Sequence, residues 1–134
     1  MLLFIITIIH WMLIGFMILA PFSNIAPILI LHITTGWSLL VHWVQNNDIC
    51  CLSLLESQLR GIDYRQGFLH QFISPVYKIT NKTISQICYT IVIFTMMLSF
   101  YNLLETSEFK KSKECYSKNG SFLECLQILF PKNL

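Results

Sequence analysis

Two long stretches of the chain contain no Asp, Glu, Lys or Arg. One runs from Met1 to Asn47 and the other from Thr83 to Leu104. Charged residues make up only 12% of the chain, whereas roughly 25% is usual for a soluble domain. So few charges leave too little polar surface to coat a water-soluble globule of 134 residues. The sequence therefore predicts an integral membrane protein that crosses the bilayer several times.

Three apolar segments are long enough to span a bilayer, which takes about 20 residues for about 30 Å of hydrocarbon. They cover 2–20, 25–44 and 84–104. Pro21 ends the first segment, and the short connection that follows requires the first two helices to be antiparallel. We therefore expect an all-α, polytopic protein whose three transmembrane helices form a single membrane domain over residues 1–134.

The first apolar segment is expected to be a retained span and not a removable signal peptide. It has no basic leading region, and Pro21 directly follows Ala20, the small residue at which cleavage would have to occur. Its apolar stretch is also longer than the core of a usual signal peptide.

The central segment, 45–82, is polar enough to leave the bilayer and is expected to carry short interfacial helices. Ser53 and Glu56 fit a capping box, from which a helix would continue to Arg60 and end at Gly61. Glu56 and Arg60 have the spacing of a helix-surface ion pair. The leucines of this helix share one face: Leu52, Leu55 and Leu59. The pattern predicts a helix on the membrane surface with its apolar side toward lipid.

Two more short helices are expected outside the spans. The apolar patch 67–77 is too short to cross the bilayer and suits a short helix ended by Pro75. In the polar and amphipathic tail, 105–134, Ser121 and Glu124 form a second capping-box pattern ahead of an apolar run. This run predicts an amphipathic helix of two or three turns.

Residues in the middle of the chain follow an ordered pattern: His32, Trp37, Cys50, Ser53, Glu56, Leu59, Arg60, Gly67, Phe68, Pro75 and Tyr77. This order resembles the central motif of a family of small, mostly bacterial integral membrane proteins of uncharacterised function. Cys51 and Leu54 stand where that family usually has proline. The resemblance implies a membrane architecture and brings no known activity with it.

The orientation in the membrane has two competing signals, both in the tail. Four lysines favour a cytosolic tail: Lys110, Lys111, Lys113 and Lys118. The glycosylation sequon at Asn119, and a disulfide that Cys115 and Cys125 could close, favour a tail in an oxidising compartment. Both orientations stay open. In either case the amino terminus and the central segment share one side.

Histidines inside membrane spans are uncommon and indicate a role. His10 and His32 could lie in one layer, as two axial haem ligands or a metal between helices would require. We favour a structural role, in which each ring bonds a carbonyl or hydroxyl of a neighbouring span. No cofactor or metal is therefore expected. Cys50 and Cys51 are adjacent, which is neither a redox nor a zinc spacing. We expect them to be buried as small apolar residues, the alternative being palmitoylation if they face the cytosol.

The second span has a face suited to close packing. Its members recur at helical spacing: His32, Thr35, Gly36, Leu39 and Trp43. Thr34 and Thr35 add hydroxyls that can bond across the helix contact, the alternative being a polar pathway. Trp11 and Trp37 lie deep in their spans and are expected to pack, whereas Trp43 suits an interfacial anchor.

No catalytic pattern stands out: the sequence has no Gly-rich phosphate loop, nucleophile elbow or pair of catalytic carboxylates. Nine basic against seven acidic residues exclude a nucleic-acid-binding chain. We expect a multi-pass, non-enzymatic structural or assembly component whose partners are the lipid bilayer and other proteins of a larger assembly, or a homo-oligomer. Low alanine content indicates an AT-rich genome, which suits a virion inner membrane or an organelle. The alternative is a small haem or metal redox or transport module using His10 and His32.

Overall fold

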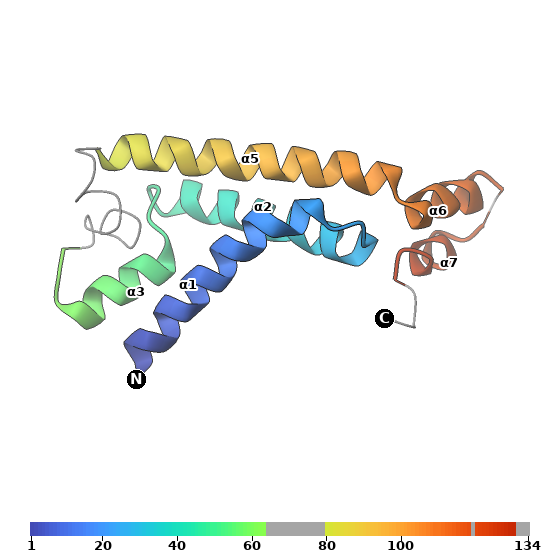
Figure 1. Cartoon of the computed structure of the whole chain (residues 1–134). Coiled ribbons are helices and arrows are strands. Elements are labelled where there is room, and N and C mark those ends of the chain that lie inside the picture. The colour runs from blue at the N-terminus through green and yellow to red at the C-terminus, as the bar shows by residue number, and fades with distance from the viewer. Residues whose placement is uncertain (64–79, 119, 131–134) are drawn as a thin grey trace.

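The computed structural model describes residues 1–63, 80–118 and 120–130, and throughout these ranges the regular structure is helical. The elements follow in this order: α1 (Leu2–Leu19), the 3-10 turn η1 (Ala20–Phe22), α2 (Ala26–Gln45), α3 (Cys51–Arg60), α5 (Asn81–Glu105), α6 (Ser107–Ser117) and α7 (Phe122–Gln127). Figure 1 shows them along the chain. The expectation of an all-α fold is confirmed.

Within the described residues, three helical segments are long and apolar enough to cross a membrane: Leu2–Phe22, Ala26–Gln45 and Lys82–Glu105. They correspond to the three expected spans. The third helix begins three residues earlier than expected, at Asn81, because Thr80 caps it and accepts a hydrogen bond from the Thr83 amide. A proline in the first turn of α2 suits a helix start, where no amide donor is needed.

Helices α2 and α5 run antiparallel along most of their length, and α1 meets them near η1 while its amino-terminal half diverges (Figure 1). Helix α3 lies beside that diverging half, and α6 and α7 lie at the opposite end of the molecule. Between the spans, the buried core forms around Met17, Val92 and Met96. Gly36 permits this approach, because a Cβ there would lie 2.5 Å from the Met96 sulfur.

The expected packing face of α2 is confirmed at its centre. His32 and Gly36 are buried, and the other members are half-buried: Thr35, Leu39 and Trp43. The expectation that threonine hydroxyls bond across the contact is wrong for Thr34, which donates to the Ile30 carbonyl of its own helix at 3.1 Å. Ser38 likewise donates to the Thr34 carbonyl at 2.9 Å. Both residues face outward, where a hydroxyl must find its partner within its own helix.

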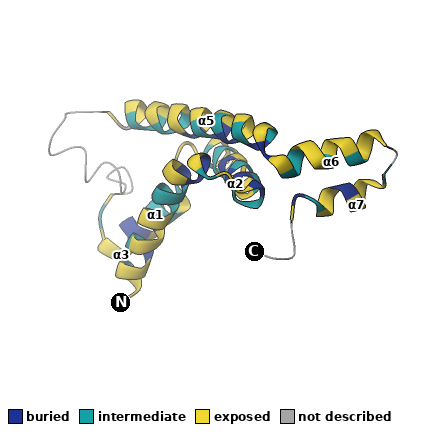
Figure 2. Cartoon of the chain, turned by 45° about the vertical axis from the view of Figure 1, so that its right-hand side comes forward, coloured by how far each residue is buried: buried dark blue, intermediate teal, exposed yellow. Residues whose placement is uncertain are grey.

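The outer faces of the spans carry large apolar side chains, seen as the exposed surfaces of α1, α2 and α5 in Figure 2. Trp11 is 51% and Trp37 60% exposed, so the expectation that they pack inside is wrong. Lipid tails solvate an indole ring as well as a protein interior does, which allows a deep tryptophan to face outward. Trp43 is half-buried and meets the Tyr89 ring edge-on at 5.3 Å between centroids.

Helix α3 begins at Cys51, two residues before the predicted cap, and the capping box at Ser53 is therefore wrong. The Glu56 carboxylate turns instead to Arg60 and His10. The predicted helix end is confirmed: Gly61 follows Arg60 with φ of +67°, a left-handed conformation that glycine adopts without strain. The expected helix over 67–77 lies outside the described residues.

The tail folds into a helical hairpin. Helix α6, which the sequence pattern did not predict, begins after Thr106, whose side chain accepts from the Phe109 amide. The predicted capping box of Ser121 and Glu124 is confirmed at the start of α7, a helix of only six residues. A disulfide between Cys115 and Cys125 joins α6 to α7, which is the pairing that the sequence left open.

Candidate functional site

His32 lies fully buried where the three spans meet, with an exposed fraction of 0%. Its Nε2 is 3.1 Å from the Met17 carbonyl oxygen on α1, and its Nδ1 is 2.8 Å from the Ser99 hydroxyl on α5. The ring thus connects α2 to both other spans. The hydrogen bonds to a carbonyl and a hydroxyl of neighbouring spans, which the sequence predicts for a structural histidine, are present at His32.

Pro21 explains why α1 needs this histidine. The Met17 carbonyl would normally accept from the amide four residues later, but that residue is Pro21, which has no N–H. A carbonyl can only accept, so Nε2 of His32 must carry the proton and donate to Met17. Nδ1 then accepts from the Ser99 hydroxyl, and every polar atom of the contact has a partner.

A second polar group, which we call the α1–α3 cluster, consists of Cys50, His10, Glu56 and Arg60. The Glu56 side chain is 1% exposed, and its Oε2 lies 3.7 Å from Nδ1 of His10. Arg60 donates to the other carboxylate oxygen from Nη2 at 2.7 Å and from Nε at 3.0 Å. The predicted Glu56–Arg60 pair is confirmed, but its expected position on the surface is wrong. Helix α3 packs on α1 with Glu56 and Ser57 buried, and it exposes three of its leucines: Leu54, Leu55 and Leu59.

Cys50 completes the cluster on the other side of the His10 ring. Its Sγ lies 3.8 Å from Nε2 of His10, within reach of a sulfur hydrogen bond. The expectation that both neighbouring cysteines are buried is wrong, since Cys50 is half-buried and Cys51 is exposed.

The loop before α3 fixes the position of Cys50. Asn47 and Asp48 have left-handed φ values of 51° and 65°, which turn the chain back after α2. The Tyr89 hydroxyl on α5 donates to Asp48 Oδ1 at 2.7 Å. The Cys51 amide, the first backbone N–H of α3, donates to Nε2 of His42 at 3.1 Å. Helices α2 and α5 thus hold the loop that presents Cys50.

The two intramembrane histidines do not share a site. Met17, which binds His32, lies seven residues along α1 from His10, or about 10 Å of helical rise. Both ring nitrogens of His32 are already hydrogen-bonded. This geometry gives no support to the alternative of a haem or metal between His10 and His32. Within residues 1–63, 80–118 and 120–130, no group of three metal-binding side chains converges.

The α1–α3 cluster instead has the order of groups used in nucleophilic catalysis. A thiol lies 3.8 Å from Nε2 of one imidazole, and a carboxylate lies 3.7 Å from its Nδ1, beyond hydrogen-bond distance. The imidazole can accept the thiol proton, and the nearby carboxylate charge favours the imidazolium that results. Arg60 in turn holds the carboxylate. The arrangement can activate a thiol, and it has the apolar surface of α3 beside it.

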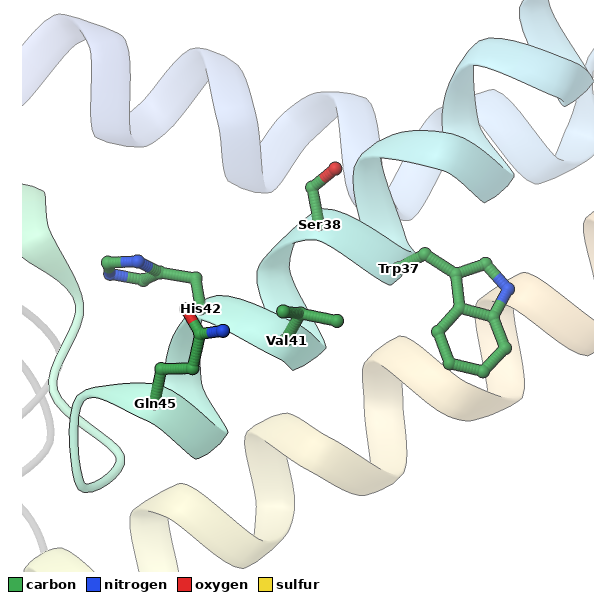
Figure 3. A pocket seen from close by; sticks show the side chains of 5 residues that line it. All are labelled: Trp37, Ser38, Val41, His42 and Gln45. Carbon is green, nitrogen blue, oxygen red and sulfur yellow. The ribbon is translucent and has the colours of Figure 1, made fainter.

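The remaining residues of the sequence pattern lie apart from this cluster. Trp37 lines a shallow, open depression on α2 with four neighbours, Ser38, Val41, His42 and Gln45 (Figure 3). All five come from one helix, and Trp37 and His42 point toward opposite ends of it. Leu59 is exposed on α3. Five residues lie outside the described ranges: Gly67, Phe68, Pro75, Tyr77 and Asn119.

Sequence reasoning found each member of the α1–α3 cluster but did not join them. His10 and Cys50 are 40 residues apart, and Glu56 was assigned to a surface pair. One signal was present: in a three-span topology, the amino-terminal half of the first span and the central segment lie on the same side of the membrane.

No family model, curated protein or solved structure matches this chain. The family resemblance of the central motif therefore remains a prediction.

Proposed function

We propose that this chain is a non-enzymatic structural or assembly subunit of a larger membrane assembly. The support comes from its outward surface. Each of the three spans exposes bulky apolar side chains over much of its length. A surface of this kind suits lipid and the spans of neighbouring subunits. The bilayer and other membrane-spanning helices are accordingly the proposed partners.

Gly15 supports contact between α1 and a helix of a neighbouring protein. A Cβ at Gly36 would collide with Met96, so that glycine serves the internal contact of α2 with α5. A Cβ at Gly15 would meet no atom within 4 Å, so internal packing gives no reason for a glycine there. Small residues in membrane spans let another helix approach closely. Gly15 thus supports the proposal that the outer face of α1 contacts a partner helix.

The tail offers a second contact surface. The disulfide fixes α6 and α7 as a hairpin, and the Ser112 hydroxyl donates to the Cys125 carbonyl at 2.8 Å. Phe122 and Leu123 project outward from α7, 65% and 68% exposed. Such a rigid apolar tip at the end of α5 suits attachment to the bilayer edge or to a neighbouring subunit. On composition, we propose a virion inner membrane or an organelle as the host.

The test is site-specific photocrosslinking in the native membrane. A benzophenone amino acid at Trp11, one helical turn from Gly15, is expected to give an adduct of one discrete mass. The same probe at Phe94, an exposed position on α5, serves as the matched control. Gly15→Ile should abolish the Trp11 adduct, because the added side chain prevents close approach, whereas Thr90→Ile should leave it unchanged. The proposal fails if the Trp11 probe gives no discrete adduct, or if Gly15→Ile leaves that adduct unchanged.

A further inference from the structure

In the α1–α3 cluster, the half-buried thiol of Cys50 lies beside His10, which in turn lies beside Glu56. Packing of α3 on α1 does not by itself require these three groups to follow one another. His10 Nε2 faces this thiol at 3.8 Å, and Nδ1 of the same ring faces the buried Glu56 carboxylate at 3.7 Å. Because the two contacts use opposite ring nitrogens, one metal ion could not bind all three side chains. The geometry is that of a nucleophile, a base and an orienting acid.

We infer that Cys50 is a site of S-acylation, at which its thiol accepts a long-chain acyl group from an acyl thioester with His10 as the base. Nε2 of His10 takes the thiol proton, and the Cys50 sulfur attacks the thioester carbonyl carbon. The bond between that carbon and the donor sulfur then breaks, and the departing sulfur takes the proton back from Nε2. One thioester replaces another, so the step needs no oxidant or reductant.

The surroundings of Cys50 favour an acyl donor with a long apolar chain. Helix α3 begins directly after Cys50 and exposes three leucines: Leu54, Leu55 and Leu59. The nearby half of α1 exposes Phe4 and Ile8. A small hydrophilic thioester would gain nothing from these surfaces, whereas each methylene of an acyl chain that leaves water contributes about 0.8 kcal/mol. The chain would lie in the bilayer beside α3 while its carbonyl reaches the thiol.

Glu56 and Arg60 are the members of the α1–α3 cluster on the far side of His10 from Cys50. The Glu56 carboxylate lies 3.7 Å from Nδ1, an ion-pair distance longer than a hydrogen bond, and its charge stabilises the imidazolium that forms during transfer. The double contact of Arg60 on Oε1 leaves Oε2 directed at the ring. These two residues position the base and do not contact the acyl donor.

Cys51 provides an internal control. Its thiol is more exposed than that of Cys50, and its described contact is through the backbone amide. If exposure alone decided modification, Cys51 would react first. If the α1–α3 cluster decides it, Cys50 reacts first.

The experiment uses the purified full-length protein in phosphatidylcholine vesicles, incubated with palmitoyl-coenzyme A at pH 7. Mass spectrometry of peptides, with and without hydroxylamine, locates the thioester. We expect labelling at Cys50 and not at Cys51, in the wild type and in Cys51→Ser. His10→Gln should slow labelling of Cys50 by about 100-fold or more, the usual contribution of a general base. Glu56→Gln should slow it by a smaller factor.

A pH series separates a base from a merely structural histidine. The thiolate is the nucleophile, and at higher pH hydroxide can take the thiol proton in place of the imidazole. The deficit of His10→Gln should therefore shrink as the pH is raised. Absence of labelling in the wild type, or equal labelling of both cysteines, would overturn the inference, and neither result depends on a variant that must fold. A folded His10→Gln protein that labels at the wild-type rate at pH 7 would overturn it as well.

Discussion

The hydrogen bond from His32 to Met17 leads to a specific prediction about Pro21. His32→Leu keeps a similar side-chain volume but removes the donor that serves the Met17 carbonyl. Pro21→Ala restores a backbone N–H within reach of that carbonyl. The damage caused by His32→Leu should therefore be smaller in a protein that also carries Pro21→Ala.

The expected magnitude follows from the two contacts that are lost. A buried carbonyl without a donor costs about 1–3 kcal/mol, and an interhelical hydrogen bond such as Ser99 to His32 contributes about 0.6–1.7 kcal/mol in a membrane protein. His32→Leu should thus lower the free energy of unfolding by about 2–5 kcal/mol. With Pro21→Ala present, the cost should fall to about 1 kcal/mol, the part due to Ser99.

Reversible unfolding in mixed micelles, with the fraction of dodecyl sulfate increased stepwise and helicity followed by circular dichroism, measures all four corners of this cycle. Thr95→Val serves as a control, because its hydroxyl donates only to the Val92 carbonyl of its own helix, at 3.1 Å. Removing it should cost less than Ser99→Ala.

The opposite result is that His32→Leu lowers the free energy of unfolding by the same amount with proline and with alanine at position 21. Independent sites add within about 0.5 kcal/mol, so a coupling below that value would mean that His32 does not serve the Met17 carbonyl. Thr95→Val costing as much as Ser99→Ala would show that the assay does not distinguish bonds between helices from bonds within one.

Four further predictions concern stability. Arg60→Met leaves the Glu56 carboxylate buried without its cation and should cost about 1–3 kcal/mol in the same micelle assay, below the full range for buried pairs because the guanidinium is partly exposed. Lys110→Ala breaks the exposed pair with Glu105 and should change the free energy of unfolding by about 0.5 kcal/mol or less. Cys115→Ser opens a disulfide between residues 10 positions apart, which should lower the stability of the tail hairpin by about 2–3 kcal/mol. Limited trypsin digestion should then cleave at the tail lysines faster than in the wild type while the spans stay intact. Equal cleavage rates in the variant and the wild type would contradict this. Gly36→Val forces a branched side chain into α5 and should cost at least about 1–3 kcal/mol, and a protein of wild-type stability would show that α2 and α5 do not touch there.

The spans could be predicted because lipid leaves a chain few options. Backbone amides in hydrocarbon must be satisfied internally, so an uncharged run of sufficient length has to be helical. Pro21 fixed the end of the first run, and the spacing of Glu56 and Arg60 identified their pair. The face of α2 around Gly36 was also predictable, since small residues mark close approach.

The outward tryptophans could not be predicted, and the reason is physical. Lipid is as apolar as a protein interior, so hydropathy does not distinguish the inner face of a span from its outer face. Trp11 and Trp37 were assigned to packing on depth alone, but depth says nothing about direction.

The α1–α3 cluster was missed for a different reason. The contact between His10 and Glu56 depends on which face of α3 meets α1, and sequence periodicity identifies the faces without pairing them. The start of α3 was misplaced because its first amide is satisfied by His42 from another helix, a contact that a local capping pattern cannot reveal.

The bond between His32 and Ser99 also bears on biogenesis. During synthesis, the hairpin of the first two helices is complete before the helix that carries Ser99 has emerged from the ribosome. Until that helix inserts, Nδ1 of His32 lacks its donor in an apolar medium, so the nascent hairpin contains an unsatisfied acceptor that draws in the last helix. We therefore expect the third helix to dock last, against a hairpin that already presents the His32 acceptor.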